Sequence, residues 1–275
     1  MSNLYFHPYT RTQLDHYKED LPQSLLIYGP SGIGLGAVIT HLSDELGIVA
    51  QVVLPEKDEK VDIEKGTITV DSIRRLYDMT KTIETGRRMI VIDYAERMGT
   101  QAQNAFLKLL EEPGKNTHFI LLSHKTSKML PTIRSRAQAF ELRPITNEQS
   151  GDLLDKLNVG DSQKRTQLLF MANGLPAELT RLAENETYFR QRAQIVRDAQ
   201  QFLQASAYDR LVLATSYKDD RAQSLLLLTD ALKLLQKNIQ EGKSSLIPKI
   251  EQVLKAYERI EANGNIRLQL AGAMV

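Results

Sequence analysis

Short apolar runs alternate with segments of helical periodicity through the first half of the chain. Such runs, about five residues long and bounded by turn residues, are typical of strands that a sheet buries on both faces. The expected strands are Ser24–Tyr28, Ala50–Leu54, Met89–Asp93, Phe119–Ser123 and Gln138–Leu142. Because helical segments separate these runs, the pattern predicts an α/β fold with a parallel five-stranded sheet and flanking helices.

Helices are predicted between these strands at Gly34–Leu46, Asp71–Ile83 and Ala102–Glu112. The first of them is followed by a glycine, which suits the end of a helix. Thr100 and Gln103 have the spacing of a capping box, in which two side chains bond to the backbone at a helix start. The third helix is therefore expected to have its cap at Thr100.

The pattern changes near Arg143 and Pro144, after which strand-like runs disappear. Thr146 is a suitable N-cap for the next helix, and from about Tyr188 onward apolar residues recur at helical spacing. We therefore expect three parts: an α/β domain at residues 1–143, a small helical lid at 144–187 and an all-helical domain at 188–275.

The composition is that of a globular protein, with 275 residues, 42% of them hydrophobic and 25% charged. The chain contains no cysteine, which excludes a disulfide framework and a thiolate metal site. Its net charge of +1 gives no overall attraction to nucleic acid. Because the start is unlike a leader and the longest apolar stretch, Leu168–Ala172, is too short to cross a membrane, a cytoplasmic location is expected.

The sequence "GPSGIGLG" follows the first predicted strand and has the outline of a phosphate-binding loop. In the pattern G-x-x-x-x-G-K-[ST], Gly29 and Gly34 occupy the two glycine positions, with Gly32 between them. The next two positions need a lysine for the outer phosphates and a hydroxyl for Mg²⁺, and here they are Leu35 and Gly36. A tight strand-to-helix turn is therefore favoured over nucleotide binding, and no cofactor is expected.

The sequence "MIVIDYAERM" has the form of the second nucleotide element, an apolar strand that ends in an aspartate. Asp93 is present, but Tyr94 stands where a glutamate would position the attacking water. A phenol cannot accept a proton at neutral pH as a carboxylate does. Intrinsic ATP hydrolysis is therefore not expected, and His118 and His124 lack the companion ligands that a metal site needs.

A resemblance to a known family comes from the stretch Gly99–Leu142, which contains the motifs "NAFLK", "LEEP" and "LPTI". This stretch resembles bacterial DNA polymerase III clamp-loader subunits, which are members of the AAA+ superfamily. The similarity is strongest over Ile68–Leu142 and extends more weakly to "ANGNIRLQLAGAMV" at the end of the chain. It implies an AAA+ core, a helical lid and a C-terminal collar domain for oligomerisation.

The resemblance also implies roles for particular residues. The pattern is similar to that of delta-prime subunits, which often have a decayed nucleotide site; the lid arginine of active members is expected near Ala177 and is absent. The family's four-cysteine zinc module cannot form, so no metal is expected. The family motif Ser-Arg-Cys reads Ser135-Arg136-Ala137, which implies that Arg136 reaches ATP in a neighbouring subunit. The alternative is that Arg136 pairs with a local surface carboxylate.

Two functions remain open. The resemblance favours a non-hydrolysing structural subunit of the DNA polymerase III complex, itself a DNA-directed DNA polymerase, with no intrinsic ATPase activity. Its expected partners are motor-type ATPase subunits, a delta-type clamp opener and, through the complex, the sliding clamp and primer-template DNA. The alternative is a divergent active AAA+ ATPase that binds nucleotide through the loop backbone and Asp93.

Overall fold

The computed structural model describes residues 4–81, 86–240 and 246–273. The chain forms two compact units, one comprising residues 1–160 and 172–180 and the other comprising residues 161–171 and 181–275. We call them the sheet unit and the helical unit. The boundary divides the residues predicted as a lid between both units, and the proposed three-part division stays a prediction.

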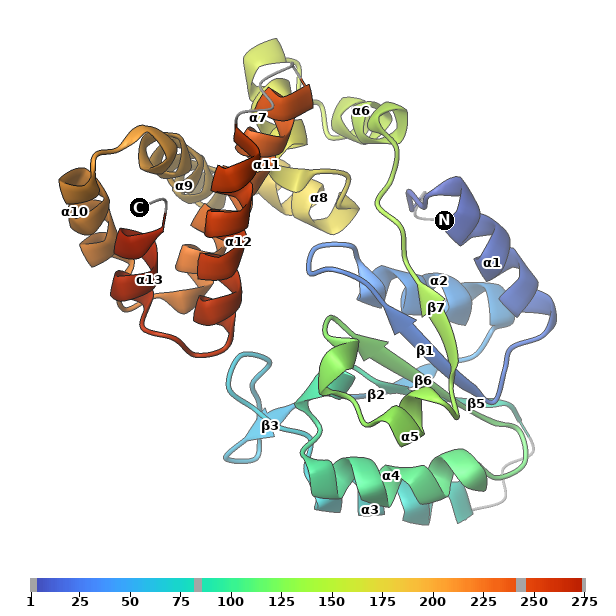
Figure 1. Cartoon of the computed structure of the whole chain (residues 1–275). Coiled ribbons are helices and arrows are strands. Elements are labelled where there is room, and N and C mark those ends of the chain that lie inside the picture. Colours follow the sequence, from blue (N-terminus) through green and yellow to red (C-terminus); the bar gives the residue numbers. More distant parts are fainter. Residues whose placement is uncertain (1–3, 82–85, 241–245, 274–275) are drawn as a thin grey trace. The chain divides into compact units, whose positions relative to one another are not determined.

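The sheet unit contains a five-stranded parallel sheet with the order β2-β5-β6-β1-β7 (Figure 1). Its strands are β1 (Ser24–Tyr28), β2 (Ala50–Val53), β5 (Arg88–Ile92), β6 (Thr117–Ser123) and β7 (Gln138–Glu141). β6 lies in the middle and pairs Leu121 with Leu26 on one side and with Ile92 on the other. The predicted α/β class with a parallel five-stranded sheet is confirmed.

Helices cover both faces of this sheet (Figure 1). The helices and short elements around it are α1 (Pro8–Glu19), α2 (Leu35–Leu46), α3 (Val70–Lys81), α4 (Thr100–Glu111), α5 (Pro131–Arg134), the 3₁₀ turns η1 (Ala95–Arg97) and η2 (Thr126–Lys128), and a hairpin of β3 (Glu56–Lys57) and β4 (Lys60–Val61). The end predicted for the second helix, Ile83, lies outside the described residues.

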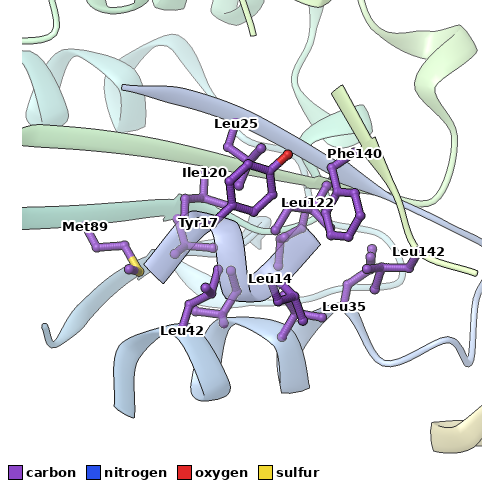
Figure 2. Packing of buried hydrophobic residues seen from close by; sticks show 14 of the residues in the cluster. Leu14, Tyr17, Leu25, Leu35, Leu42, Met89, Ile120, Leu122, Phe140 and Leu142 are labelled. Carbon is purple, nitrogen blue, oxygen red and sulfur yellow. The ribbon is translucent and has the colours of Figure 1, made fainter. Parts of the chain in front are cut away.

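Alternate residues of each strand belong to different cores. Leu25 and Ile27 of β1 pack with α1 and α2, whereas Leu26 between them packs with α3 and α4. Figure 2 shows the first core, in which the Tyr17 ring meets the Phe140 ring edge-on with centroids 5.6 Å apart. Because both faces are covered, the middle positions of the central strands are apolar on both sides, which explains the continuous apolar runs in the sequence.

The residues predicted as a lid form α6 (Asn147–Lys156), α7 (Ser162–Ala172) and α8 (Pro176–Glu184). The predicted N-cap Thr146 is confirmed, since its hydroxyl accepts the backbone N–H of Gln149 at 3.2 Å. The Gln149 side chain accepts the backbone N–H of Thr146 in return, which completes a capping box.

The rest of the helical unit consists of α9 (Glu186–Gln204), α10 (Ala207–Tyr217), α11 (Arg221–Gln240), α12 (Ile247–Glu261) and α13 (Ile266–Gly272). These helices share one apolar core, in which Phe202, Leu227 and Val253 are fully or almost fully buried. In the part of the chain that the structure describes, no helix combines the length and hydropathy needed to cross a membrane.

Candidate functional site

The loop between β1 and α2 has the backbone of a strand–loop–helix turn. Gly32 and Gly34 have φ values of 89° and 93°, in the left-handed region that favours glycine. Gly34 is the N-cap of α2, and its carbonyl accepts the N–H of Ala37 at 3.1 Å. Both glycines are therefore required by the turn itself, whether or not an anion binds there.

The two positions that should carry phosphate and metal contacts have other surroundings. Leu35 is only 4% exposed and belongs to the core beside Leu14 and Leu142 (Figure 2). At Gly36 an added Cβ would meet no atom within 4 Å, so this position has space but no functional group. The loop is therefore a glycine-rich strand-to-helix turn whose first helical residue is part of the apolar core.

The start of α8 packs directly against this loop. The backbone N–H of Glu178 donates to the carbonyl of Gly32 at 3.0 Å, and a Cβ added at Gly32 would lie 2.8 Å from the Glu178 Cβ. A Cβ added at Gly34 would lie 3.7 Å from the Cβ of Ala177. Ala177, the position at which the resemblance implies an arginine, is thus next to the loop and offers it only a methyl group.

The second nucleotide element ends at Asp93, which directly follows β5. Its carboxylate accepts the backbone N–H of Tyr94 at 2.9 Å. Burial raises the pKa of the Asp93 carboxyl, and the hydrogen bond from Tyr94 partly opposes this rise. Burial also raises the pKa of the Tyr94 phenol, so that this group stays protonated and cannot act as a base near neutral pH.

Two further residues complete the group at this edge of the sheet. His124 follows β6, and its Nδ1 donates to the Gly29 carbonyl at 2.9 Å. Its ring packs edge-on against the Tyr94 ring, with the ring centroids 5.6 Å apart. Glu96 accepts the backbone N–H of His124 at 3.2 Å through Oε1, and its Oε2 is buried without a hydrogen-bond partner. The sequence named His124 only as a candidate metal ligand and did not single out Glu96, although side chains that follow the carboxyl ends of adjacent parallel strands are favoured positions for a site.

These groups do not form a recognisable metal site. Within residues 4–81, 86–240 and 246–273, no three or more His, Asp or Glu side chains are grouped so that they could hold a metal ion. The arrangement instead joins the β1–α2 loop to the segment after β5 through His124, which bonds to Gly29 on one side and contacts Tyr94 and Glu96 on the other.

The predicted capping box at Thr100 and Gln103 is wrong. The N-cap of α4 is Gly99, without a side-chain cap bond, and Gln103 is buried with 3% of its surface exposed. Its Nε2 donates to the carbonyls of Met98 and Lys128 at 3.0 and 3.1 Å, and its Oε1 accepts the N–H of Leu130 at 2.7 Å. Gln103 therefore links α4 by hydrogen bonds to the segment 128–130, which leads into α5.

Arg136 lies two residues after the end of α5, the short helix that follows this hydrogen-bonded segment. Its guanidinium pairs with Glu111 Oε1 at 2.8 Å and donates to the carbonyl of Thr132 at 3.2 Å. The hydroxyl of Ser135 also donates to Thr132, at 3.1 Å. The side chains of Arg136 and Glu111 remain 40% and 51% exposed, and an exposed ion pair of this kind contributes about 0–1 kcal/mol to stability. The surface carboxylate foreseen as an alternative is thus present, but it holds Arg136 only weakly.

Comparisons with known proteins agree with the resemblance. Residues 48–146 match the model of a family described as DNA polymerase III, delta subunit. The DNA polymerase III subunit delta' of Pseudomonas aeruginosa is 32% identical over 206 residues, which are 65% of this chain and 60% of that protein. These matches support the delta-prime clamp-loader subunit family as the family of this chain. It spans less than two thirds of the length of this Pseudomonas relative.

Two more distant similarities accompany this delta-prime family match. Replication factor C subunit 5 of Mus musculus is 31% identical over 137 residues, 47% of this chain and 39% of that protein. A DNA polymerase III gamma subunit-related protein of Thermotoga maritima aligns with 94% of this chain and 96% of its own, at 18% identity and a TM-score of 0.49. The family match contains Asp93, Gln103 and Arg136, whereas the loop Gly29–Gly36 precedes it.

Proposed function

We propose that this delta-prime family member is a non-hydrolysing structural subunit of a DNA polymerase III clamp loader. It helps to load the sliding clamp onto primed DNA during replication and lends Arg136, aided by Ser135, to ATP bound by a neighbouring motor-type subunit. The other partner is a delta-type clamp opener. A guanidinium placed at the transferred phosphoryl group stabilises the charge that develops there, without any nucleotide bound to the donor.

The observation that carries this proposal is the contrast between two sites of the sheet unit: the β1–α2 loop and the segment that contains Arg136. At the chain's own loop, Leu35 is a core residue and the N–H of Glu178 is bonded to Gly32. At the second site, the side chain of Arg136 is exposed, and its carboxylate partner Glu111 is exposed as well. The chain thus lacks the lysine at position 35, the hydroxyl at position 36 and the carboxylate at position 94 that hydrolysis needs, while a guanidinium is accessible to a neighbour.

A nucleotide titration of the isolated chain, with and without Mg²⁺, tests the non-hydrolysing role. We expect no Mg²⁺-dependent micromolar affinity for ATP and no turnover, because Leu35 and Gly36 stand where a phosphate-binding lysine and a metal-binding hydroxyl are needed. Micromolar affinity that requires Mg²⁺, together with turnover, would instead establish the alternative of a divergent active AAA+ ATPase.

Restoring the loop's consensus residues is not expected to create an ATPase. In the double variant Leu35→Lys, Gly36→Thr, position 94 still lacks a carboxylate, and a lysine at the 4%-exposed position 35 places a charge against the core. We therefore expect no measurable turnover and a lower midpoint of urea unfolding. Gly36→Thr alone serves as the control, because its site is open. Robust turnover by the double variant would contradict this account of the loop.

The helical unit presents an apolar stripe that suits a collar contact with other clamp-loader subunits. Tyr208, Leu211 and Val212 lie on one face of α10 and are 73%, 38% and 54% exposed. Large exposed apolar patches often mark partner surfaces, and tyrosine is enriched among the residues that dominate binding energy. We therefore assign this stripe to assembly with neighbouring subunits.

Charge introduced into this stripe is expected to weaken assembly. Tyr208→Asp combined with Val212→Asp should raise the dissociation constant of the chain from its partner subunits by about tenfold or more, since such central residues often contribute over 1 kcal/mol each. Sedimentation of the reconstituted complex measures the effect. Val61→Asp is the matched control, because it changes a valine of β4 that is 60% exposed, close to the 54% of Val212. Unchanged assembly in the double variant would remove the stripe from the interface.

A further inference from the structure

A continuous groove runs along the surface of the helical unit, at a place that the α10 stripe does not reach. One part is a cavity of about 320 Å³ between α7, α9 and α11, with a floor that includes Phe170, Val196 and Leu234. A second cavity of about 840 Å³ continues toward the start of α12 and shares Arg197, Gln200 and Leu234 with the first. The shared residues make the two cavities one groove.

The edges of this groove carry positive charge. Arg197 of α9 and Lys237 of α11 lie on the edges of the first cavity, and Lys249 of α12 lies at the far end of the second. Among the described residues that line either cavity, none is Asp or Glu. Arg197 donates to the amide oxygen of Gln194, at 2.6 and 3.2 Å, and this neutral partner leaves its charge uncompensated.

The nearest acidic residue on α9 is already bound elsewhere. The carboxylate of Asp198 accepts the hydroxyl proton of Tyr217 at 2.6 Å and the amide of Gln194 at 2.7 Å. Uncharged side chains, namely several glutamines together with Thr166 and Asn238, supply the other polar groups of the groove. An apolar floor with cationic edges and neutral donors complements a ligand that has an apolar face and negatively charged flanks.

The length of the groove indicates what kind of ligand fits it. The lining residues of α9 run from Ala193 to Gln204, which corresponds to about 17 Å along a helix axis. This is the length of about three helical turns, which present apolar residues at i, i+3, i+4 and i+7 to a groove. We propose that the groove binds a short acidic amphipathic helix of a partner protein.

Selection from a phage-displayed library of random 12-residue peptides, with the full chain as target, tests this proposal. Enriched sequences are expected to combine helically spaced apolar residues with Glu or Asp, and to bind as synthetic peptides with micromolar Kd in fluorescence anisotropy. Their affinity should fall as salt concentration rises, because salt screens attraction between exposed charges. In the double variant Arg197→Glu, Lys237→Glu, affinity should fall at least tenfold.

Arg190→Glu is the matched control, since Arg190 lies on α9, is 78% exposed and is not among the groove's lining residues. This variant should bind the selected peptides as the wild type does. Enrichment of neutral or basic peptides, the absence of any enriched peptide, or equal binding to the double variant would overturn the proposal. It would also be overturned if the chain self-associated in sedimentation and the double variant did not, since a second copy would then occupy the groove.

Discussion

Replacement of Arg136 by Ala is expected to slow ATP hydrolysis about 10³-fold at the one interface that this arginine serves in the reconstituted clamp loader. The fold should be unaffected, because Arg136 is 40% exposed and its bond to Glu111 is a surface ion pair. Under the proposed function the other interfaces have arginines of their own, so total hydrolysis is expected to fall by the share of a single site. Clamp loading needs coordinated sites and should suffer more.

The measurement is the rate of ATP hydrolysis and of clamp loading, both stimulated by primed DNA. Arg134→Ala is the matched control, since Arg134 is an exposed arginine two residues earlier, at the end of α5. It should leave both rates unchanged. If Arg134→Ala slows loading while Arg136→Ala does not, the wrong arginine has been assigned. If neither variant changes a rate, no trans role for this segment remains.

Glu111→Gln separates a role in catalysis from a role in local structure. This change removes the ion pair but keeps the guanidinium of Arg136, and an exposed pair is worth at most about 1 kcal/mol. We therefore expect hydrolysis within about fivefold of the wild-type rate, since 1 kcal/mol corresponds to roughly that factor. A loss as large as that of Arg136→Ala would mean that the ion pair itself, and not a free guanidinium, is what the complex needs.

Replacement of Asp230 by Ala is expected to destabilise the helical unit by about 3–5 kcal/mol. Asp230 is fully buried, and its carboxylate lies 3.0 Å from the guanidinium of Arg192, which is 3% exposed. Lys233 Nζ lies 3.5 Å from the same carboxylate. Removal of the carboxylate leaves the guanidinium buried without its counter-charge, which costs far more than the loss of a surface pair.

Urea unfolding followed by circular dichroism measures this loss. The double variant Arg192→Met, Asp230→Leu is the informative companion, since replacing both charges with apolar side chains of similar size is often neutral or stabilising. It should recover most of the stability lost in Asp230→Ala. A cost below about 1 kcal/mol for Asp230→Ala, the value typical of an exposed pair, would show that the buried charges are solvated in another way.

The sequence by itself determined the class of the fold and most of its elements. A strand covered on both faces needs apolar residues on both of its sides, so the central strands appear as apolar runs. The predicted limits of all five strands lie within two residues of the observed ones, and those of β1 are identical. The glycines of the loop and the cap at Thr146 were also predictable, because turn and cap geometry depend on neighbouring residues. The motifs of Gly99–Leu142 gave the family resemblance, which the match over residues 48–146 supports, while the role of Arg136 stays a prediction.

Only the tertiary structure determined which distant residues meet. Nothing local to Gln103 indicates that its amide bonds to Lys128 and Leu130, so its spacing from Thr100 gave the wrong cap. The contact of Glu178 with Gly32, the pairing of Arg136 with Glu111, and the bond from His124 to Gly29 each join separate elements. Periodicity reports which face of an element is buried, because burial selects residue type along one helix or strand. It does not report the partner, because many arrangements of the same elements bury the same faces.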